Sequence, residues 1–322
     1  MKFFGTLTIV LLLTGAAISQ NLEVYDLSVE HKKNPMGLEA PSPRLSWKLR
    51  SSAKNVLQTH YQIQVAEVNN FPTTHLTWES NKVASDQSTL IPYAGEKLAP
   101  GNRYYWRVRA WDNAGNVSEW STPAYWEMGL FDGDWKAQWI EPIQEEQANA
   151  PALLVRKKAS IGKTIKSARA YVTAHGLYEL FINGQQVGDE VFTPGWTKYQ
   201  DRLQYQVYDI TNYLKTGENA IGAMLGDGWY RGHLAWQDNW GVYGKKLGLL
   251  CQIQINYADG SSEMILTDNT WKGTSNGPIT MNSIYNGETY DARKELNGWS
   301  TVTFDDSSWK PVNVADHGYK EL

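Results

Sequence analysis

The stretch Leu98-Ala-Pro-Gly-Asn-Arg-Tyr-Tyr-Trp-Arg-Val-Arg-Ala-Trp111 decides the fold of the first part of the chain. Its first seven residues have the Leu-x-Pro-x-x-x-Tyr form of a tyrosine corner, which ties a loop back onto a Greek-key strand. The residues from Tyr104 onward are predicted to form that strand. Asp112-Asn-Ala-Gly115 then supplies a hairpin turn, and Ser118-Glu-Trp-Ser121 is predicted to be the returning strand. The stretch therefore predicts an antiparallel β-sandwich.

Short strands separated by turn residues are predicted on both sides of this hairpin, from residue 20 to about residue 132. Tyr61-Gln-Ile-Gln-Val-Ala66 alternates polar and apolar side chains, as a half-buried strand does. Leu45-Ser-Trp47 places a Trp in an early strand, where it would fill a sandwich core. Residues 20–132 are therefore predicted to be one seven-stranded sandwich.

A second strand-rich region is predicted from residue 151 to residue 322. Its clearest strands lie on the two sides of a hairpin turn at Asn183-Gly184, and further turns are expected at Asp259-Gly260 and Asn286-Gly287. Antiparallel strands over this length favour a jelly-roll β-sandwich. Residues 133–150 carry no strand pattern, so they are predicted to be a linker. The fold class is thus all-β.

The composition excludes several classes of protein. The chain has 322 residues, 30 basic and 34 acidic, and a net charge of −4, so nothing in it favours nucleic acid or an anionic membrane as a partner. The single cysteine, Cys251, excludes an internal disulfide and a cysteine-based zinc cluster. It lies in an apolar strand pattern and is expected to be an inert core thiol.

The first residues resemble a signal peptide. Lys2 supplies the positive start, residues 3–17 supply an apolar stretch, and Ala17-Ile-Ser19 supplies small residues for cleavage. The apolar run is shorter than the roughly 20 residues that a membrane-spanning helix needs. Residues 1–19 are therefore predicted to be removed, leaving an exported protein in the periplasm or the medium.

Common catalytic motifs are absent from the sequence. There is no Gly-x-Ser-x-Gly elbow, phosphate-binding loop, His-Glu-x-x-His or dinucleotide fingerprint. The six His residues are scattered, and His175 is expected to be structural. Acidic pairs are able to hydrolyse glycosides, but spacing alone does not pair the acids of this chain. Most of them are expected to cap turns.

Two loop segments carry an unusual mixture of aromatic and polar residues. Pro194-Gly-Trp-Thr-Lys-Tyr199 is followed by Asp201 and Arg202, and Gly226-Asp-Gly-Trp-Tyr230 leads into Trp236-Gln-Asp-Asn-Trp240. Aromatic rings stack on the apolar faces of a pyranose, while acids, amides and Arg bind its hydroxyls. These loops therefore predict a sugar site. The alternative is that the rings pack beneath the loops.

Such loops also suggest a bound calcium ion, because extracellular β-sandwiches often bind calcium through oxygen ligands. Asp227, Asp238 and Asn239 are the oxygen donors that the sequence offers for it, without any EF-hand spacing.

The order of the motifs resembles the N-terminal region of bacterial α-L-rhamnosidases of glycoside hydrolase family 78. The resemblance extends over nearly all of the chain after residue 19. The motifs that carry it are Asn34-Pro-Met-Gly37, Pro43-Arg-Leu-Ser-Trp47, Ala137-Gln-Trp-Ile140, Leu177-Tyr-Glu-Leu-Phe-Ile-Asn-Gly184, Leu225-Gly-Asp-Gly-Trp-Tyr230, Asn286-Gly-Glu-Thr-Tyr-Asp-Ala-Arg293 and Phe304-Asp-Asp-Ser-Ser-Trp309.

The resemblance implies a fibronectin-III-like domain followed by a sandwich similar to carbohydrate-binding module family 67. That module is known for calcium-dependent binding of terminal L-rhamnose. The candidate sugar-binding residues are Trp196, Tyr199, Arg202, Asp227, Trp229, Tyr230, Trp236, Asp238, Asn239, Glu288 and Asp291.

The sequence departs from the family in one respect. Such enzymes carry their catalytic carboxylates on a helical (α/α)₆ barrel, and no run of amphipathic helices occurs here. We therefore expect the chain to be the accessory part of a longer enzyme that cleaves terminal α-L-rhamnosides of plant polysaccharides. The alternatives are a stand-alone rhamnose-binding module and a structural spacer without a ligand.

Overall fold

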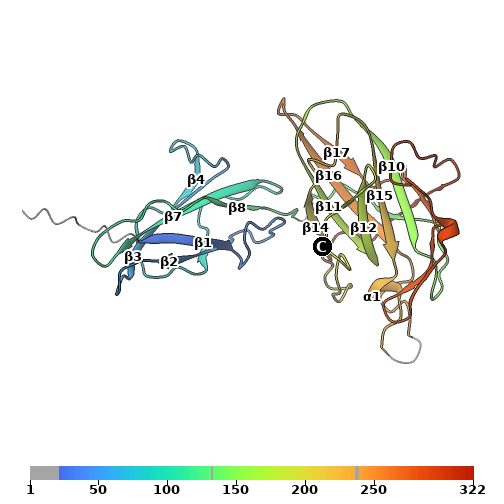
Figure 1. Ribbon diagram of the computed structural model, residues 1–322, viewed down its shortest axis with the longest axis horizontal. Helices are drawn as coiled ribbons and strands as arrows, with labels where there is room; N and C mark the ends of the chain where they lie inside the picture. Colours follow the sequence, from blue (N-terminus) through green and yellow to red (C-terminus); the bar gives the residue numbers. More distant parts are fainter. Residues whose placement is uncertain (1–21, 132, 236–238) are drawn as a thin grey trace, which may run out of the picture. The chain divides into compact units, whose positions relative to one another are not determined.

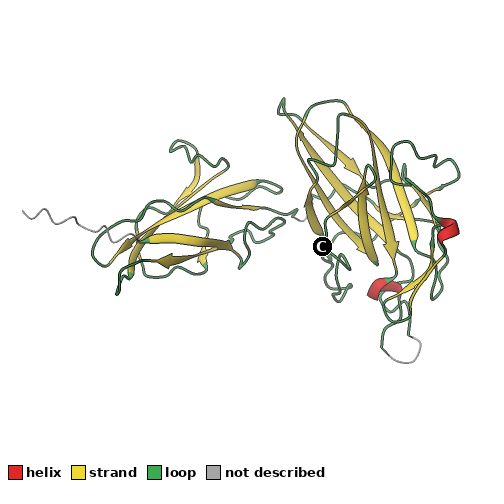
Figure 2. Ribbon diagram, in the orientation of Figure 1, coloured by secondary structure: helices red, strands yellow, loops and turns green. Residues whose placement is uncertain are grey.

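The computed structural model describes residues 22–131, 133–235 and 239–322. Nearly all regular structure in these residues is β-strand (Figure 2). The chain forms two compact units, with the boundary between Met128 and Gly129. None of the helices in the described ranges is long and apolar enough to cross a membrane. The predicted signal peptide, residues 1–19, lies outside the described residues.

The first unit is a β-sandwich of two sheets, as the sequence predicts (Figure 1). One sheet has the order β1-β2-β6, and the other has the order β4-β3-β7-β8, with β5 paired to β3. Their bounds are β1 Glu23–Val29, β2 Arg44–Arg50, β3 Gln58–Ala66, β4 Leu76–Glu79, β5 Val83–Ala84, β6 Ile91–Pro92, β7 Arg103–Asp112 and β8 Ala124–Glu127.

The core of this unit is built on the alternation of β7, whose residues are buried and partly exposed in turn. Trp47 fills the core, as expected, and its Nε1 donates to Oε1 of Gln58 at 3.0 Å. The tyrosine corner is present, because the hydroxyl of buried Tyr104 accepts a hydrogen bond of 2.8 Å from the backbone N–H of Ala99. The bond joins the partly buried backbone of Ala99 to the strand that carries Tyr104, so it fixes the loop on the sandwich.

Replacing Tyr104 with Phe is expected to lower the free energy of unfolding by about 1 kcal/mol, because the partly buried amide of Ala99 loses its acceptor. Denaturant unfolding monitored by circular dichroism measures this. Tyr25→Phe, at a partly exposed tyrosine of the same unit, is the matched control. Equal midpoints for the two variants would contradict a stabilising corner.

The returning strand of the hairpin is not where the sequence predicts it. The regular strand is β8, whereas residues 118–121 lie outside it. There, the hydroxyls of Ser118 and Ser121 accept hydrogen bonds from the backbone N–H groups of Ala110 and Val108. Side-chain oxygens that satisfy the edge of a neighbouring strand compete with a regular ladder. The pairing therefore becomes regular only after residue 121.

The second unit is a larger sandwich of two antiparallel sheets with a separate hairpin. The sheet orders are β13-β12-β15-β10-β18-β21 and β14-β11-β16-β9-β22, with β17 paired to β16. The bounds are β9 Trp139–Glu141, β10 Leu153–Ile161, β11 Ile165–His175, β12 Leu177–Ile182, β13 Gln185–Val187, β14 Gln206–Asp209, β15 Gly217–Gly226, α1 Gly228–Arg231, β16 Gly248–Tyr257, β17 Ser262–Leu266, β18 Lys272–Thr274, β19 Ile279–Ser283, β20 Gly287–Tyr290, η1 Ala292–Lys294, β21 Lys310–Pro311 and β22 Asn313–Ala315.

The three predicted hairpin turns are all present in this unit. Asn183-Gly184 joins β12 to β13, with φ of 52° and 86°, as the left-handed turn of a tight hairpin requires. Asp259-Gly260 joins β16 to β17, and Asn286-Gly287 joins β19 to β20. Cys251 lies between the sheets, and burial raises the pKa of its thiol to about 12, so it is the inert core residue expected.

The predicted linker is wrong in part. Residues 139–141 of that segment form β9, which pairs with β16 and β22 inside the second sandwich. The strand is too short to show a period in the sequence, and Trp139 and Ile140 are buried by long-range pairing. The second unit thus begins before residue 151.

Candidate functional site

Two tryptophan rings stack on each other in the loops after β13 and β15. The rings of Trp196 and Trp229 are nearly parallel, with centroids 5.6 Å apart and planes 6° apart. Phe192 packs edge-on against Trp229 at 5.9 Å. Trp196 is 53% exposed, so one face of the stack is open to solvent. We call Phe192, Trp196 and Trp229 the ring stack. It offers a flat apolar platform of the kind that a pyranose covers.

The backbone around the ring stack is held by specific contacts. The Oγ1 of Thr193 donates to the carbonyl oxygen of Tyr178 at 2.6 Å, which joins the loop to β12. Gly228 begins α1 with a φ of 53°, and a Cβ at that position would lie 2.6 Å from Cγ of Leu177. Only glycine fits both conditions, which explains the Gly before Trp229. α1 directly follows β15 at one end of the sandwich (Figure 1).

Two of the predicted sugar-binding rings are buried beneath the loops. Tyr199 and Tyr230 pack edge to face at 5.3 Å in a hydrophobic cluster. Burial raises the pKa of the Tyr230 hydroxyl to about 12. The hydroxyl of Tyr199 donates to the carbonyl oxygen of Gly195 at 3.1 Å and so supports the loop that carries Trp196. These two tyrosines thus pack beneath the loops and support them, which is the alternative that the sequence analysis left open.

Asp227 forms a buried ion pair. Its carboxylate is 1% exposed, and its Oδ1 accepts a hydrogen bond of 2.7 Å from Nε of Arg231. Burial raises the pKa of Asp227, and the charge of Arg231 opposes this rise. Arg231 also donates to Gln144 and to the carbonyl oxygen of Pro151. Since Asp227 faces its ion-pair partner, we leave it out of the sugar site.

A cavity of about 530 Å³ adjoins the ring stack. Phe192 belongs to both, so the two features are continuous. The apolar part of its lining includes Leu177, Val191, Phe192, Met224 and Ile284. Polar side chains of the lining are Glu179, Asn282, Ser283 and Glu288. A largely apolar hollow with a few polar groups is typical of small-molecule sites.

The other predicted residues are scattered. Glu288 lines the cavity, whereas Asp291 accepts from the backbone N–H of Arg293 and caps η1. Arg202 and Asn239 are exposed. Trp236 and Asp238 lie outside the described residues.

One predicted calcium ligand, Asp238, lies outside the described residues, so calcium binding stays a prediction. In the part of the chain that the structure describes, no three His, Cys, Asp or Glu side chains lie close enough together to hold a metal ion. The carboxylate of Asp227 is bound by Arg231. The donor set therefore does not fit a calcium ion at Asp227.

His175 has the structural place expected of it. Its ring lies between the rings of Trp139 and Tyr230, with centroid distances of 4.1 and 4.6 Å and nearly parallel planes. Burial, followed by the nearby His317, lowers the pKa of His175 to about 3. It is therefore neutral and packed as a flat ring.

Several residues of the site were not among the sequence-based candidates. Val191 and Phe192 are apolar and exposed in a loop, Val191 by 78%, and Glu179 lines the cavity from β12. Tyr243 accepts a hydrogen bond of 3.3 Å from Nε1 of Trp196. Two apolar residues between the turn signals Gly188 and Pro194 were the available clue, because a loop seldom exposes such side chains without a use.

Two family matches agree with this architecture. Residues 24–132 match the Rha78A-like, N-terminal immunoglobulin domain, and residues 163–322 match the alpha-L-rhamnosidase N-terminal domain. Both domains belong to the N-terminal region of alpha-L-rhamnosidases. The family resemblance of the sequence is thereby confirmed, and so is the order of an immunoglobulin-like sandwich before a larger one.

Individual alpha-L-rhamnosidases also match most of this chain. An alpha-L-rhamnosidase of Formosa agariphila is 38% identical over 88% of this chain and 32% of its own length. The solved alpha-L-rhamnosidase of Dictyoglumus thermophilum has a TM-score of 0.84 and 38% identity, over 92% of this chain and 34% of the other. That of Streptomyces avermitilis, complexed with L-rhamnose, has a TM-score of 0.82 and 28% identity, over 93% and 45%. The chain thus spans about a third of the curated relative from Formosa.

Proposed function

We propose that this chain is the accessory N-terminal region of an exported α-L-rhamnosidase, and that its second domain binds rhamnose-containing glycan at the ring stack. The observation that carries the proposal is the exposed ring of Trp196, stacked on the partly buried ring of Trp229 beside an open cavity. In the intact enzyme, hydrolysis of terminal α-L-rhamnosides would take place on polypeptide beyond this region. The accessory region would hold plant polysaccharide near that catalytic part.

The chemistry of the sugar fits the chemistry of the site. L-rhamnose carries a methyl group where most hexoses carry a hydroxymethyl group, so it has more apolar surface to bury. The lining by Leu177, Val191 and Met224 suits that methyl group, at about 25 cal/mol per Å² of apolar surface removed from water. The exposed face of Trp196 suits the C–H face of the pyranose.

The polar part of the lining suits the hydroxyls. Carboxylates of Glu179 and Glu288 accept hydrogen bonds, and the amide of Asn282 both donates and accepts. Asn282 is also fixed by the fold, because its Oδ1 accepts from the backbone N–H of Asp227 at 2.6 Å. A few preorganised polar groups in an apolar hollow provide specificity for one sugar.

Calorimetric titration of the whole chain with L-rhamnose tests the proposal. We expect saturable heat at weak affinity, and a second titration in EDTA tests the sequence-based prediction of calcium. Loss of the heat in EDTA would support a divalent cation in the site. Absence of heat in both buffers would favour the third interpretation, a spacer without a ligand.

The chain by itself is expected to release no 4-nitrophenol from 4-nitrophenyl α-L-rhamnoside. The reason is that the family resemblance places the acid and base carboxylates on the helical barrel, which the sequence does not contain. Absorbance of the released phenolate measures this. Turnover above that of boiled protein would overturn the assignment of catalysis to the missing part.

A further inference from the structure

Cations and aromatic rings alternate on one face of the first domain. The guanidinium of Arg107 lies 4.4 Å from the ring centroid of Phe71 and 4.5 Å from that of Trp120. Arg109 lies 4.7 Å from Trp120 and 5.2 Å from Trp111. Lys82 continues the series, with its Nζ 4.5 Å from the ring centroid of Trp111. We call Phe71, Arg107, Trp120, Arg109, Trp111 and Lys82 the arginine row.

The two arginines of this row have amide partners in place of carboxylates. Nε and Nη2 of Arg107 donate to Oε1 of Gln64, and Nε of Arg109 donates to Oε1 of Gln62. Both amides in turn donate to one carboxylate, Glu79, at 2.7 and 2.8 Å. Glu79 is therefore connected to the two guanidinium groups only through the amides of Gln62 and Gln64. One negative charge is shared by two positive ones, so the row keeps a net positive charge.

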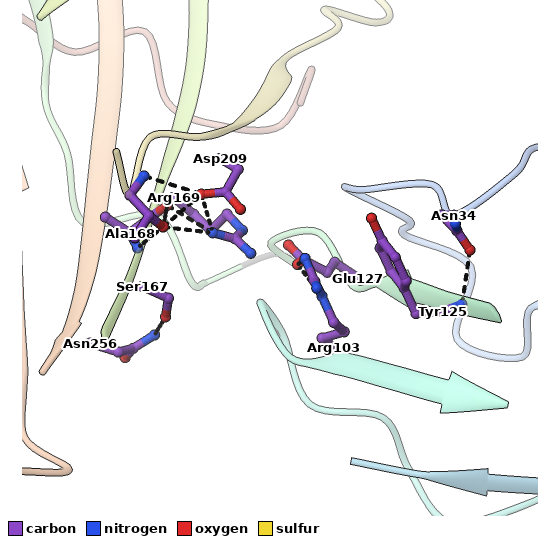
Figure 3. Close-up of polar contacts among 10 residues, drawn as sticks. Asn34, Arg103, Tyr125, Glu127, Ser167, Ala168, Arg169, Asp209 and Asn256 are labelled. Carbon is purple, nitrogen blue, oxygen red and sulfur yellow. Dashed lines mark hydrogen bonds and ion pairs between the residues drawn. The ribbon is translucent and has the colours of Figure 1, made fainter. Parts of the chain in front are cut away.

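The other arginines of the same domain are neutralised directly. Arg103, at the start of the same strand, forms an ion pair with Glu127, and Figure 3 shows these side chains facing each other. Arg44 pairs with Glu30, and Arg50 pairs with Glu23. Among the described arginines of the first domain, only Arg107 and Arg109 form no ion pair with a carboxylate.

The two guanidinium groups also repel each other. They are two residues apart on β7, which places their backbone positions about 6.6 Å apart on the same side of the strand. The pKa of Arg107 is lowered by burial and then by the charge of Arg109. A bound anion would relieve both effects, because it would offset the repulsion and replace lost water.

Several N–H donors of the two guanidinium groups are available. The ring centroids lie 4.4–5.2 Å from the Cζ atoms, and the N–H donors lie in the plane of each group. Among the described residues, no acceptor binds Nη1 of Arg107 or either Nη of Arg109. A planar guanidinium fixed in this way is preorganised for a carboxylate, which it binds with two parallel hydrogen bonds.

We propose that the arginine row binds the carboxylate groups of an acidic polysaccharide. Two arginines two residues apart face successive charged sugars, and the partly exposed ring of Trp111 provides a stacking surface between charges. The site lies in the first domain and shares no residue with the ring stack, so it stands whether or not the second domain binds rhamnose. With both sites, one chain would hold an uronic-acid-bearing backbone and a neutral rhamnose group.

Binding of polygalacturonate to the whole chain tests this proposal, with fully methyl-esterified polygalacturonate as the matched polymer without charge. We expect the charged polymer alone to retard the protein in affinity electrophoresis. The retardation should fall when salt is raised from about 0.01 to 0.15 M, because the Debye length shrinks from about 30 to 8 Å. Equal retardation by the ester would overturn the proposal without any variant.

The double variant R107Q/R109Q is expected to weaken polygalacturonate binding by roughly tenfold or more. R44Q/R50Q, which removes the same charge from the opposite sheet of the same domain, is the control and should bind like the wild type. Equal losses of polygalacturonate affinity in the two variants would show that only the net charge of the domain matters. That result would overturn the arginine row as a specific site. Equally tight binding of duplex DNA at the same charge concentration would overturn the assignment to a polysaccharide.

Discussion

Arg231→Met is expected to destabilise the second domain by about 3–5 kcal/mol, because the carboxylate of Asp227 is left buried without its partner. This is a large share of the roughly 5–15 kcal/mol that stabilises a typical domain. Arg231 also donates to Gln144, so the segment before β10 loses an anchor at the same time. Scanning calorimetry should show a transition lowered by roughly 10 °C.

The double variant D227N/R231M is the control, because it removes both charges. It should recover much of the loss, since the cost comes from one unpaired buried charge. A single variant as stable as the wild type would show that water reaches Asp227, contrary to its 1% exposure.

The pH dependence of Arg231→Met provides a second check. Burial already raises the pKa of Asp227, and removing Arg231 takes away the main opposing cause. A carboxyl whose pKa is raised in the folded state stabilises the fold below its unfolded pKa and loses this contribution as the pH rises through the folded pKa. The deficit of the variant should therefore shrink as the pH falls from about 7 toward 4.

Trp196→Ala is expected to weaken binding of L-rhamnose by roughly tenfold or more, the loss of about 1.4 kcal/mol that separates an anchor from an ordinary contact. The ring is 53% exposed and its open face is the platform, so truncation removes the contact with the sugar. Stability should change by less than about 0.5 kcal/mol, as for other exposed positions. Titration calorimetry and thermal unfolding measure the two effects.

Tyr290→Ala is the matched control for this variant. Tyr290 is 51% exposed on the same domain, outside the cavity lining, and its hydroxyl bonds to Glu295. Trp229→Ala should also weaken binding, because Trp229 packs between Phe192 and Trp196 and supports the open ring. If Trp196→Ala and Trp229→Ala both bound L-rhamnose like the control, the ring stack would not be a sugar site.

The sequence located the loops of the candidate site but only some of its members. The aromatic loops of residues 194–199 and 226–230 carry rings, glycines and polar residues that no core strand needs, so the sequence located the loops. It did not separate Trp196 from Tyr199, three residues apart. The ring of Trp196 is exposed, whereas that of Tyr199 lies in a hydrophobic cluster with side chains from distant segments, such as Trp135 and Leu250.

Local chemistry, readable in the sequence, determined the strands, the hairpin turns at Asn183-Gly184 and Asn286-Gly287, and the tyrosine corner at Tyr104. Each depends on residues within a few positions, through side-chain alternation and the freedom of glycine at positive φ. Tertiary structure alone decided the partner of Asp227, the pairing of β9 and the cavity beside Phe192. These features join segments far apart in the chain, and which groups lose water there depends on all the segments that cover them.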